Sequence, residues 1–350
     1  MKSEELGAVR FRTTLVGVAL IAATVGLVSA ALPPALGGPL NGLQVFPRSN
    51  WWHLDVSRAP VDPSSAAYID FVSGRTTTNP TATRRVHPDF GASPYGFPYV
   101  VVSGDQPLVR PTWVAYGDES DEGAPGRPLG YPIPVEARTT ANYIEGAVPG
   151  GGLSGDRHLL IIDRDNGFLF ETAGTYWNPA LNRWEADCGA IFNLNTNDRR
   201  PETWTSSDAA GLAVFPGLVR YEDVFSGAEI DHAFRVTVRA TNGYVWPASH
   251  RAGSTSGALP MGARLRLKAS KNLSSYPPEI QRIFRAMQKY GLIVADNGTD
   301  MLVSGTMDSR WDNNVLNPAF HSLLADDFEV VQLGWRGSAV SAPTGVRIIK

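Results

Sequence analysis

The most regular alternation of apolar and polar residues lies between His232 and His250. Two β-type segments there flank Asn242-Gly243, a pair typical of a two-residue hairpin turn. We therefore predict an antiparallel hairpin whose successive side chains point to opposite faces. The apolar face would carry His232, Phe234, Val236, Val238 and Val245. The other face would carry polar and aromatic side chains, namely Arg235, Thr237, Arg239, Tyr244, Trp246 and His250.

A second hairpin is predicted from His158 to Thr172, with its turn at residues 164–167. Both faces of its two strands are largely apolar, which is typical of interior strands covered on both sides. One of these faces would place two titratable side chains, His158 and Glu171, among aliphatic residues.

The pattern changes after residue 259. A strand is predicted over 263–269 and a helix over about 277–290, with prolines in its first turn and Gly291 as its stop. A third hairpin is predicted around Asp296-Asn297-Gly298, between strands 292–295 and 301–304, and a short helix over 312–316.

Glycine (35 residues) and proline (26 residues) are frequent and spread among these β-type runs, which favours many short strands and turns. We predict a mainly β fold, a β-sandwich or jelly-roll with one C-terminal α-helix and long loops. The chain of 350 residues shows no internal repeat and no sharp break in composition. Residues 42–331 are therefore expected to form one elaborated sandwich domain, followed by a tail over 332–350.

The first 31 residues have the pattern of a secretory signal. Lys2, Arg10 and Arg12 precede an uncharged run over 13–32 that contains Val28-Ser29-Ala30, a small-x-small pattern before Ala31. We expect export, with cleavage near Ala30 or Ala31, and a protein that is secreted or lies in the cell envelope. The alternative is an uncleaved anchor, since the run is nearly long enough to span a bilayer. Membrane contact is expected only through that segment.

Charge and cysteine content exclude several classes of site. The net charge of −3 argues against nucleic acid as a partner, because phosphate binding needs a basic excess. Cys188 is the only cysteine, which rules out an intramolecular disulfide and a thiolate metal site.

No zinc-protease helix motif, phosphate-binding glycine loop or serine-nucleophile elbow occurs. Residues 163–167 resemble part of a calcium loop, but loop position twelve is Gly174, so we predict a turn. No cofactor is expected, and calcium is left open.

The polar face of the first hairpin is the leading candidate site. Elimination at a uronate needs a cation for the carboxylate, a base, and an acid for the leaving oxygen. His250 and Tyr244 would supply the base and acid, Arg235 and Arg239 would bind the carboxylate, and Trp246 would stack on a sugar. The same residues also fit a solvated sheet face.

Carboxylates and two further histidines give a second group of candidates. Glu229 and Asp231 would share a strand face about 6–7 Å apart, within the range used for glycoside hydrolysis. The simpler interpretation is an ordinary polar strand end. His87 before Pro88 would add a base to a cleft or cap a loop, and His158 with Glu171 forms a further titratable pair.

Several motifs, taken together, resemble those of a known protein family. They are HPDFG from His87, PYVVVSGDQP from Pro98, DRHLLIIDRD from Asp156, SSDAAGLAVFPGLVRYEDV from Ser206, AEIDHAF from Ala228, VWPASH from Val245, VADNGTD from Val294 and RWD from Arg310. The ordered set, spanning roughly residues 42–331, resembles a widespread family of exported, functionally uncharacterised bacterial proteins. The resemblance implies one coherent exported unit and assigns no catalytic residue.

These observations predict an exported protein that acts on polysaccharide, either as a hydrolase using carboxylates or as a lyase using the hairpin face. The alternative is a non-catalytic protein that binds carbohydrate or has a structural role in the cell envelope. Nine tryptophans suit sugar-stacking platforms, and they also suit a large core.

Overall fold

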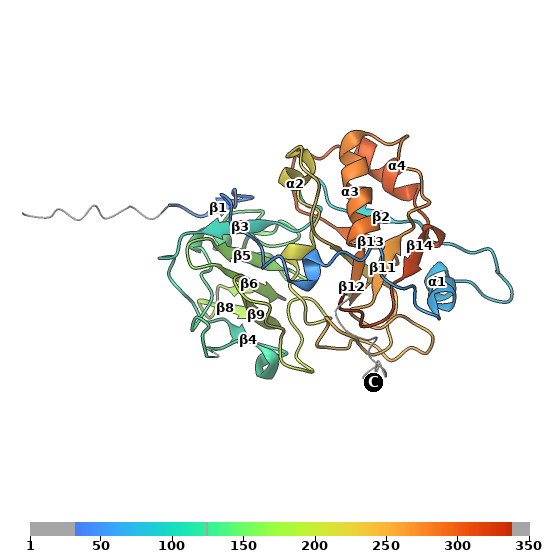
Figure 1. Ribbon diagram of the computed structural model, residues 1–350. Coiled ribbons are helices and arrows are strands. Elements are labelled where there is room, and N and C mark those ends of the chain that lie inside the picture. The colour runs from blue at the N-terminus through green and yellow to red at the C-terminus, as the bar shows by residue number, and fades with distance from the viewer. Residues whose placement is uncertain (1–31, 124, 338–350) are drawn as a thin grey trace, which may run out of the picture. The chain divides into compact units, whose positions relative to one another are not determined.

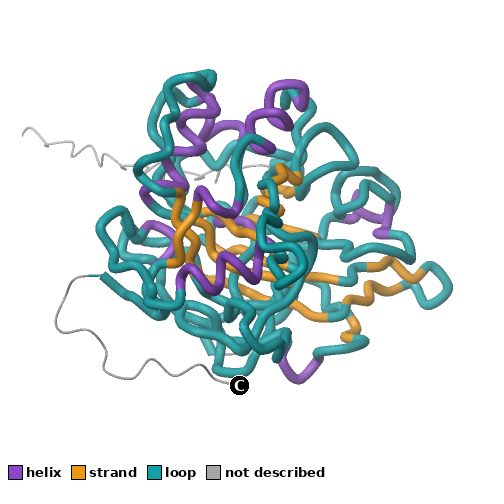
Figure 2. The backbone as a smooth tube through the Cα atoms, turned by 90° about the vertical axis from the view of Figure 1, so that its right-hand side faces the viewer, coloured by secondary structure: helices purple, strands orange, loops and turns teal. Residues whose placement is uncertain are grey.

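Three open sheets carry the fold in residues 32–123 and 125–337, the part of the chain that the computed structural model describes (Figure 1). Strands are more abundant than helices there, and long loops connect them, as the teal segments of Figure 2 show. The predictions of a strand-rich fold and of long loops are confirmed. A closed sandwich is not seen in this part of the chain, because parallel and antiparallel pairs are mixed within open sheets.

The first sheet contains the predicted hairpin of residues 158–172. β5 and β6 pair antiparallel, with Asp163 opposite Phe168, so residues 164–167 form the turn as predicted. One face of this pair joins the main core through Leu160, and the other joins a second core through Ile161. The strand order is β1 (Ala35–Leu36), β3 (Tyr99–Val102), β5 (Leu159–Asp163), β6 (Phe168–Ala173) and β9 (Cys188–Asn193).

The second sheet contains β10 near its centre, and this overturns the hairpin predicted around Asn242-Gly243. β10 pairs parallel with β12 and antiparallel with β13. A type I′ turn needs positive φ at both central residues, but here only Gly243 has it, at 69°. The strand order is β14 (Phe328–Val330), β11 (Arg264–Leu267), β12 (Leu292–Asn297), β10 (Phe234–Val238), β13 (Leu302–Ser304) and β2 (His87–Asp89).

The hairpin predicted around Asp296-Asn297-Gly298 is also wrong. Its two strands exist as β12 and β13, but β10 lies between them in the sheet. The turn residues therefore lead the chain past β10 rather than directly back onto β12.

The third sheet is small and the helices are short. The order is β4 (Thr112–Trp113), β8 (Arg183–Ala186) and β7 (Tyr176–Asn178). Instead of one C-terminal helix, the described residues contain four α-helices: α1 (Ser65–Ser73), α2 (Tyr221–Phe225), α3 (Pro278–Lys289) and α4 (Asn313–His321). Single turns of 3-10 helix occur at Trp51–His53, Gly117–Glu119, Val135–Arg138, Pro149–Gly151, Phe215–Gly217 and Ala325–Asp327.

The helix predicted over about 277–290 is confirmed as α3. Its apolar side chains Ile280, Ile283, Phe284 and Met287 are buried, and Gly291 follows its end with φ at 77°. α3 packs against β11 and α4 packs against β2, so both helices lie beside the second sheet (Figure 1).

The main core is shared by the first two sheets. Leu160 and Leu169 of the first sheet belong to the same cluster of buried side chains as Phe234 and Val294 of the second. Polar groups that lie between these sheets are therefore removed from water, which is the setting of the site below.

The predicted signal segment, residues 1–31, lies outside the described residues, as does residue 338 onward of the predicted tail. Within the described residues, no helix is long and apolar enough to cross a membrane.

Candidate functional site

A buried arginine of β10 is the centre of the candidate site. Arg235 donates from Nε to Asp208 Oδ2 at 2.9 Å and from Nη2 to Asp208 Oδ1 at 2.8 Å, and its Nη1 donates to Ser304 Oγ at 2.6 Å. Asp208 is fully buried and Arg235 is 3% exposed. A buried charge pair is stable only when its hydrogen bonds are made, as they are here.

The loop that carries Asp208 is held in place by Glu171 of β6. The two Glu171 carboxylate oxygens accept hydrogen bonds from the Ser207 hydroxyl at 2.8 Å and from the backbone N–H groups of Val214 and Phe215 at 2.9 and 2.8 Å. Burial raises the pKa of Glu171 to about 7, despite these three donors. Glu171 thus positions the loop rather than facing solvent.

His158 lies at the start of β5 and bridges this loop to Glu145. Its Nδ1 lies 2.6 Å from Glu145 Oε2, and its Nε2 lies 2.8 Å from the carbonyl oxygen of Ser207. Both partners accept hydrogen bonds, so both ring nitrogens carry a proton and the ring is cationic. Burial alone would lower the pKa of His158, but the Glu145 carboxylate outweighs it and raises the pKa to about 9.

Three half-buried carboxylates surround these buried groups: Asp89 at the end of β2, Glu145 in the loop before β5, and Asp296 in β12. Asp296 Oδ2 lies 3.9 Å from Arg235 Nη2. The charges of Glu145 and Asp89 also interact with Arg235. We call the four acids Asp89, Glu145, Asp208 and Asp296 the carboxylate cluster.

The outer acids of the carboxylate cluster differ in proton affinity. Burial, together with the charge of Asp208, raises the pKa of Asp296 to about 6, and burial also raises the pKa of Asp89. Burial would raise the pKa of Glu145 as well, but the charge and hydrogen bonds of His158 hold it below its ordinary value. Asp296 and Glu145 both interact with the charge of Arg235 and differ in proton affinity, and general acid–base catalysis needs two acids that differ in this way.

Among the residues predicted from sequence, Arg235, His158 and Glu171 come together at this site, and His250 lies at its edge. The His250 Nδ1–H donates to the carbonyl oxygen of Ala209 at 2.8 Å, next to Asp208 in the chain. The nearby Ala252 carbonyl accepts from Asn297 Nδ2 at 3.1 Å, next to Asp296. The segment of His250 therefore flanks the carboxylate cluster.

The other residues predicted for the hairpin face lie elsewhere, because the chain leaves the strand after Val238. Arg239 pairs with Asp300 and donates to the carbonyl oxygen of Val72 at the end of α1. The Tyr244 hydroxyl donates to Glu202 at 2.9 Å. Trp246 packs edge-on against Trp51 with ring centroids 6.3 Å apart. No single polar face unites them with Arg235.

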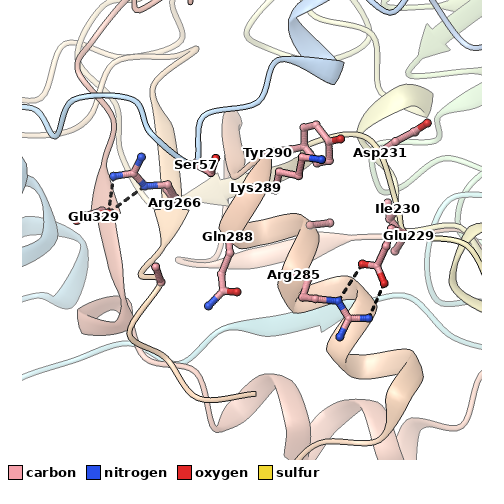
Figure 3. Close-up of a pocket in the computed structure, with 12 residues that line it drawn as sticks. Ser57, Glu229, Ile230, Asp231, Arg266, Arg285, Gln288, Lys289, Tyr290 and Glu329 are labelled. Atoms are coloured by element: carbon pink, nitrogen blue, oxygen red, sulfur yellow. Dashed lines mark hydrogen bonds and ion pairs between the residues drawn. The ribbon is translucent and has the colours of Figure 1, made fainter. Parts of the chain in front are cut away.

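Glu229 and Asp231 do not lie on a strand, yet both line a groove beside α3 (Figure 3). Glu229 accepts two hydrogen bonds from Arg285, at 2.9 and 2.7 Å, and Asp231 pairs with Arg48. The Arg285 guanidinium holds the pKa of Glu229 below its ordinary value, so this carboxylate is poorly suited to donate a proton.

His87 lies two residues before Asp89 and contacts the last residue of α4. Its Nδ1 lies 3.0 Å from His321 Nε2. Burial, with the nearby His321 and Arg85, lowers the pKa of His87. His87 thus joins β2 to α4.

Sequence reasoning missed all four acids of the carboxylate cluster. A shared signal was available, since each is followed within three residues by a glycine: Gly91, Gly146, Gly211 and Gly298. Functional side chains concentrate in loops and at the ends of strands, and a nearby glycine marks such a turn.

The turn at residues 164–167 is confirmed, and Asp163 serves it as a hydrogen-bond acceptor. Its carboxylate accepts from the Asn166 side chain at 2.7 Å and from the Asn166 backbone N–H at 3.0 Å. Over residues 32–123 and 125–337, no group of three or more His, Cys, Asp or Glu side chains is arranged to hold a metal ion.

Comparison with protein-family models, with curated proteins and with solved structures gives no match to this chain. The resemblance to exported bacterial proteins therefore stays a prediction, and the functional argument rests on the geometry of the site.

Proposed function

We propose that the protein is exported and hydrolyses glycosidic bonds of a polysaccharide at the carboxylate cluster. The observation that carries the proposal is the meeting of three half-buried carboxylates, from three separate segments, around the buried Arg235 and His158. Glycoside hydrolysis needs two carboxyl groups in unlike environments, one to protonate the leaving oxygen and one to act as base or nucleophile.

The environments suggest a division of roles. Asp296 is the proton donor, since its pKa is raised to about 6 by burial and by Asp208. Glu145 is the ionised partner, because the His158 imidazolium stabilises its charged form. Asp208 takes no part in proton transfer, since both of its oxygens bind Arg235.

The same geometry favours hydrolysis over elimination. A lyase needs a cation that can bind the uronate carboxylate of its substrate. Arg235 uses three of its nitrogens on Asp208 and Ser304, and His158 uses both of its nitrogens on Glu145 and Ser207. Both cations are also buried, so neither is accessible to a substrate carboxylate.

The test is a screen of the purified secreted chain against neutral, amino-sugar and uronate-containing polysaccharides. We expect new reducing ends without the ultraviolet absorbance of unsaturated products. Unsaturated products would instead identify elimination, and binding without any cleavage would favour the non-catalytic alternative. N-terminal sequencing of the secreted form is expected to begin near Ala31, and a form that retains Met1 would contradict cleavage.

A further inference from the structure

The groove beside α3 has the volume of a ligand site. Its volume is about 600 Å³, within the range of roughly 300–1,000 Å³ typical of small-molecule sites. Figure 3 shows side chains of α3 in its middle, with the Arg266–Glu329 pair on one side and Glu229 on the other. None of the residues that line it belongs to the carboxylate cluster.

Charges in this groove are balanced within the protein. Arg266 donates from Nε and Nη2 to Glu329 Oε1, at 2.9 and 2.6 Å. Arg285 pairs with Glu229 on the opposite side, and Lys289 and Asp231 add one charge of each sign. A charged ligand would therefore meet as much repulsion as attraction, whereas a neutral one would not disturb the pairs.

Hydrogen-bonding groups nevertheless remain for a ligand. Both bonds from Arg266 go to one oxygen of Glu329, which leaves Oε2 as an acceptor. The hydroxyl of Ser57 and the ammonium of Lys289 line the same groove as donors. Ala269 is exposed and supplies apolar surface in the groove, with small contributions from the largely buried Ala286 and Ile230. Apolar surface together with fixed polar groups matches the C–H faces and hydroxyl groups of a sugar chain.

We infer that this groove binds a neutral oligosaccharide and is a carbohydrate-binding site separate from the carboxylate cluster. The ion pairs hold their side chains in fixed orientations, so a ligand that accepts from or donates to them loses less conformational entropy on binding. Binding a segment of polymer in this groove requires no chemical reaction there. The inference is therefore independent of the proposed hydrolysis.

The test uses isothermal titration calorimetry on the secreted chain carrying Asp296→Asn, so that turnover does not remove the ligand. The probes are hexasaccharides of β-linked glucose, mannose and xylose, compared with an oligogalacturonate and a chitosan oligosaccharide. Ala269→Trp places an indole in the groove, while Ser270→Trp adds the same ring at the adjacent exposed residue, which does not line it.

We expect at least one neutral hexasaccharide to bind, with an affinity at least about tenfold weaker in Ala269→Trp and unchanged in Ser270→Trp, since a filled pocket loses most of its contact area. Lys289→Ala is expected to weaken binding by about tenfold or more, the effect of losing one charged hydrogen-bond donor. Melting temperatures of all variants establish that each is folded, and a Ser57→Ala, Lys289→Ala double variant replaces Ala269→Trp if that variant does not fold.

Three results would overturn the inference: no neutral hexasaccharide binds, the charged oligosaccharides bind more tightly, or Ala269→Trp binds as Ser270→Trp does. Hydrolysis measured in parallel on the unsubstituted chain reports on the carboxylate cluster alone. If one proposal is contradicted, the other can therefore still be tested.

Discussion

Asp296 and Glu145 are chemically similar acids that the fold makes unequal. Asp296 lies near the buried Asp208, and burial raises its pKa to about 6, while the imidazolium of His158 keeps Glu145 ionised. An acid that must be protonated and a base that must be ionised give a bell-shaped dependence of kcat/KM on pH. We expect activity to fall above about pH 6 as Asp296 loses its proton.

Asp296→Asn is expected to lower kcat on polysaccharide by about 10²- to 10⁴-fold, the usual contribution of a general acid. An aryl glycoside with an acidic phenol as leaving group needs little protonation, so the loss on that substrate is expected to be much smaller. Glu145→Gln should lower kcat on both substrates, and Glu122→Gln, at an exposed residue outside both sites, should change neither. Equal losses on both substrates for Asp296→Asn would contradict its role as acid.

The loop that positions Asp208 depends on a single side chain of β6. The two carboxylate oxygens of Glu171 accept three hydrogen bonds, from Ser207, Val214 and Phe215. Glu171→Gln keeps one acceptor oxygen and turns an amide N–H₂ toward at least one backbone N–H. A buried donor without a partner costs about 1–3 kcal/mol. We expect that loss in the free energy of unfolding at pH 5, where Glu171 carries its proton and the substitution relieves no buried charge, and no measurable change for the exposed Glu122→Gln. Urea denaturation measures both.

Secondary structure with local partners was predictable, and structure with distant partners was not. The β5–β6 hairpin needs only the turn at 164–167, and α3 needs only its own apolar period, so both could be predicted. β10 has a strand-like alternation, but its parallel partner β12 begins at Leu292, after β11 and α3 have intervened. Alternation identifies a strand and does not identify its neighbour, so the turn signal at Asn242-Gly243 was misleading.

The candidate site was predictable only in part for the same reason. His158 and Glu171 were predicted as a pair on one face of a hairpin. Both bind the loop at Ser207, but the acid that pairs with His158 is Glu145. Arg235 was recognised, but its partner Asp208 lies on a loop and Ser304 on a strand that the sequence paired wrongly. An acid in a loop, such as Asp208 or Glu145, carries no period that points to a partner. The positions of Asp89 and Asp296 follow only from the sheet order.

At the scale of the whole molecule, the buried titratable groups give stability an unusual dependence on pH. Burial raises the pKa of Glu171 from 4.5 to about 7. Against the effect of burial, Glu145 raises the pKa of His158 from 6.5 to about 9. A folded state that binds a proton more tightly than the unfolded chain loses stability as the pH rises between the two pKa values. Stability should therefore fall between pH 4.5 and 7 through Glu171 and between pH 6.5 and 9 through His158.

Each of these shifts corresponds to roughly 3 kcal/mol at full extent, because one pKa unit is worth about 1.4 kcal/mol. Arg220 and His232 lower the pKa of Asp223 to about 2 despite its burial. Protonation of Asp223 therefore changes stability only below pH 4, and it does not offset the losses through Glu171 and His158. The lowered pKa values of His53, His87 and His232 act in the opposite direction below pH 6.5. The midpoint of guanidinium unfolding, measured at pH 5, 7 and 9, should therefore fall most clearly between pH 7 and 9. His158→Gln should flatten the upper part of the profile, and a wild-type midpoint that rises toward pH 9 would show that the imidazolium between Glu145 and Ser207 is not what stabilises this region.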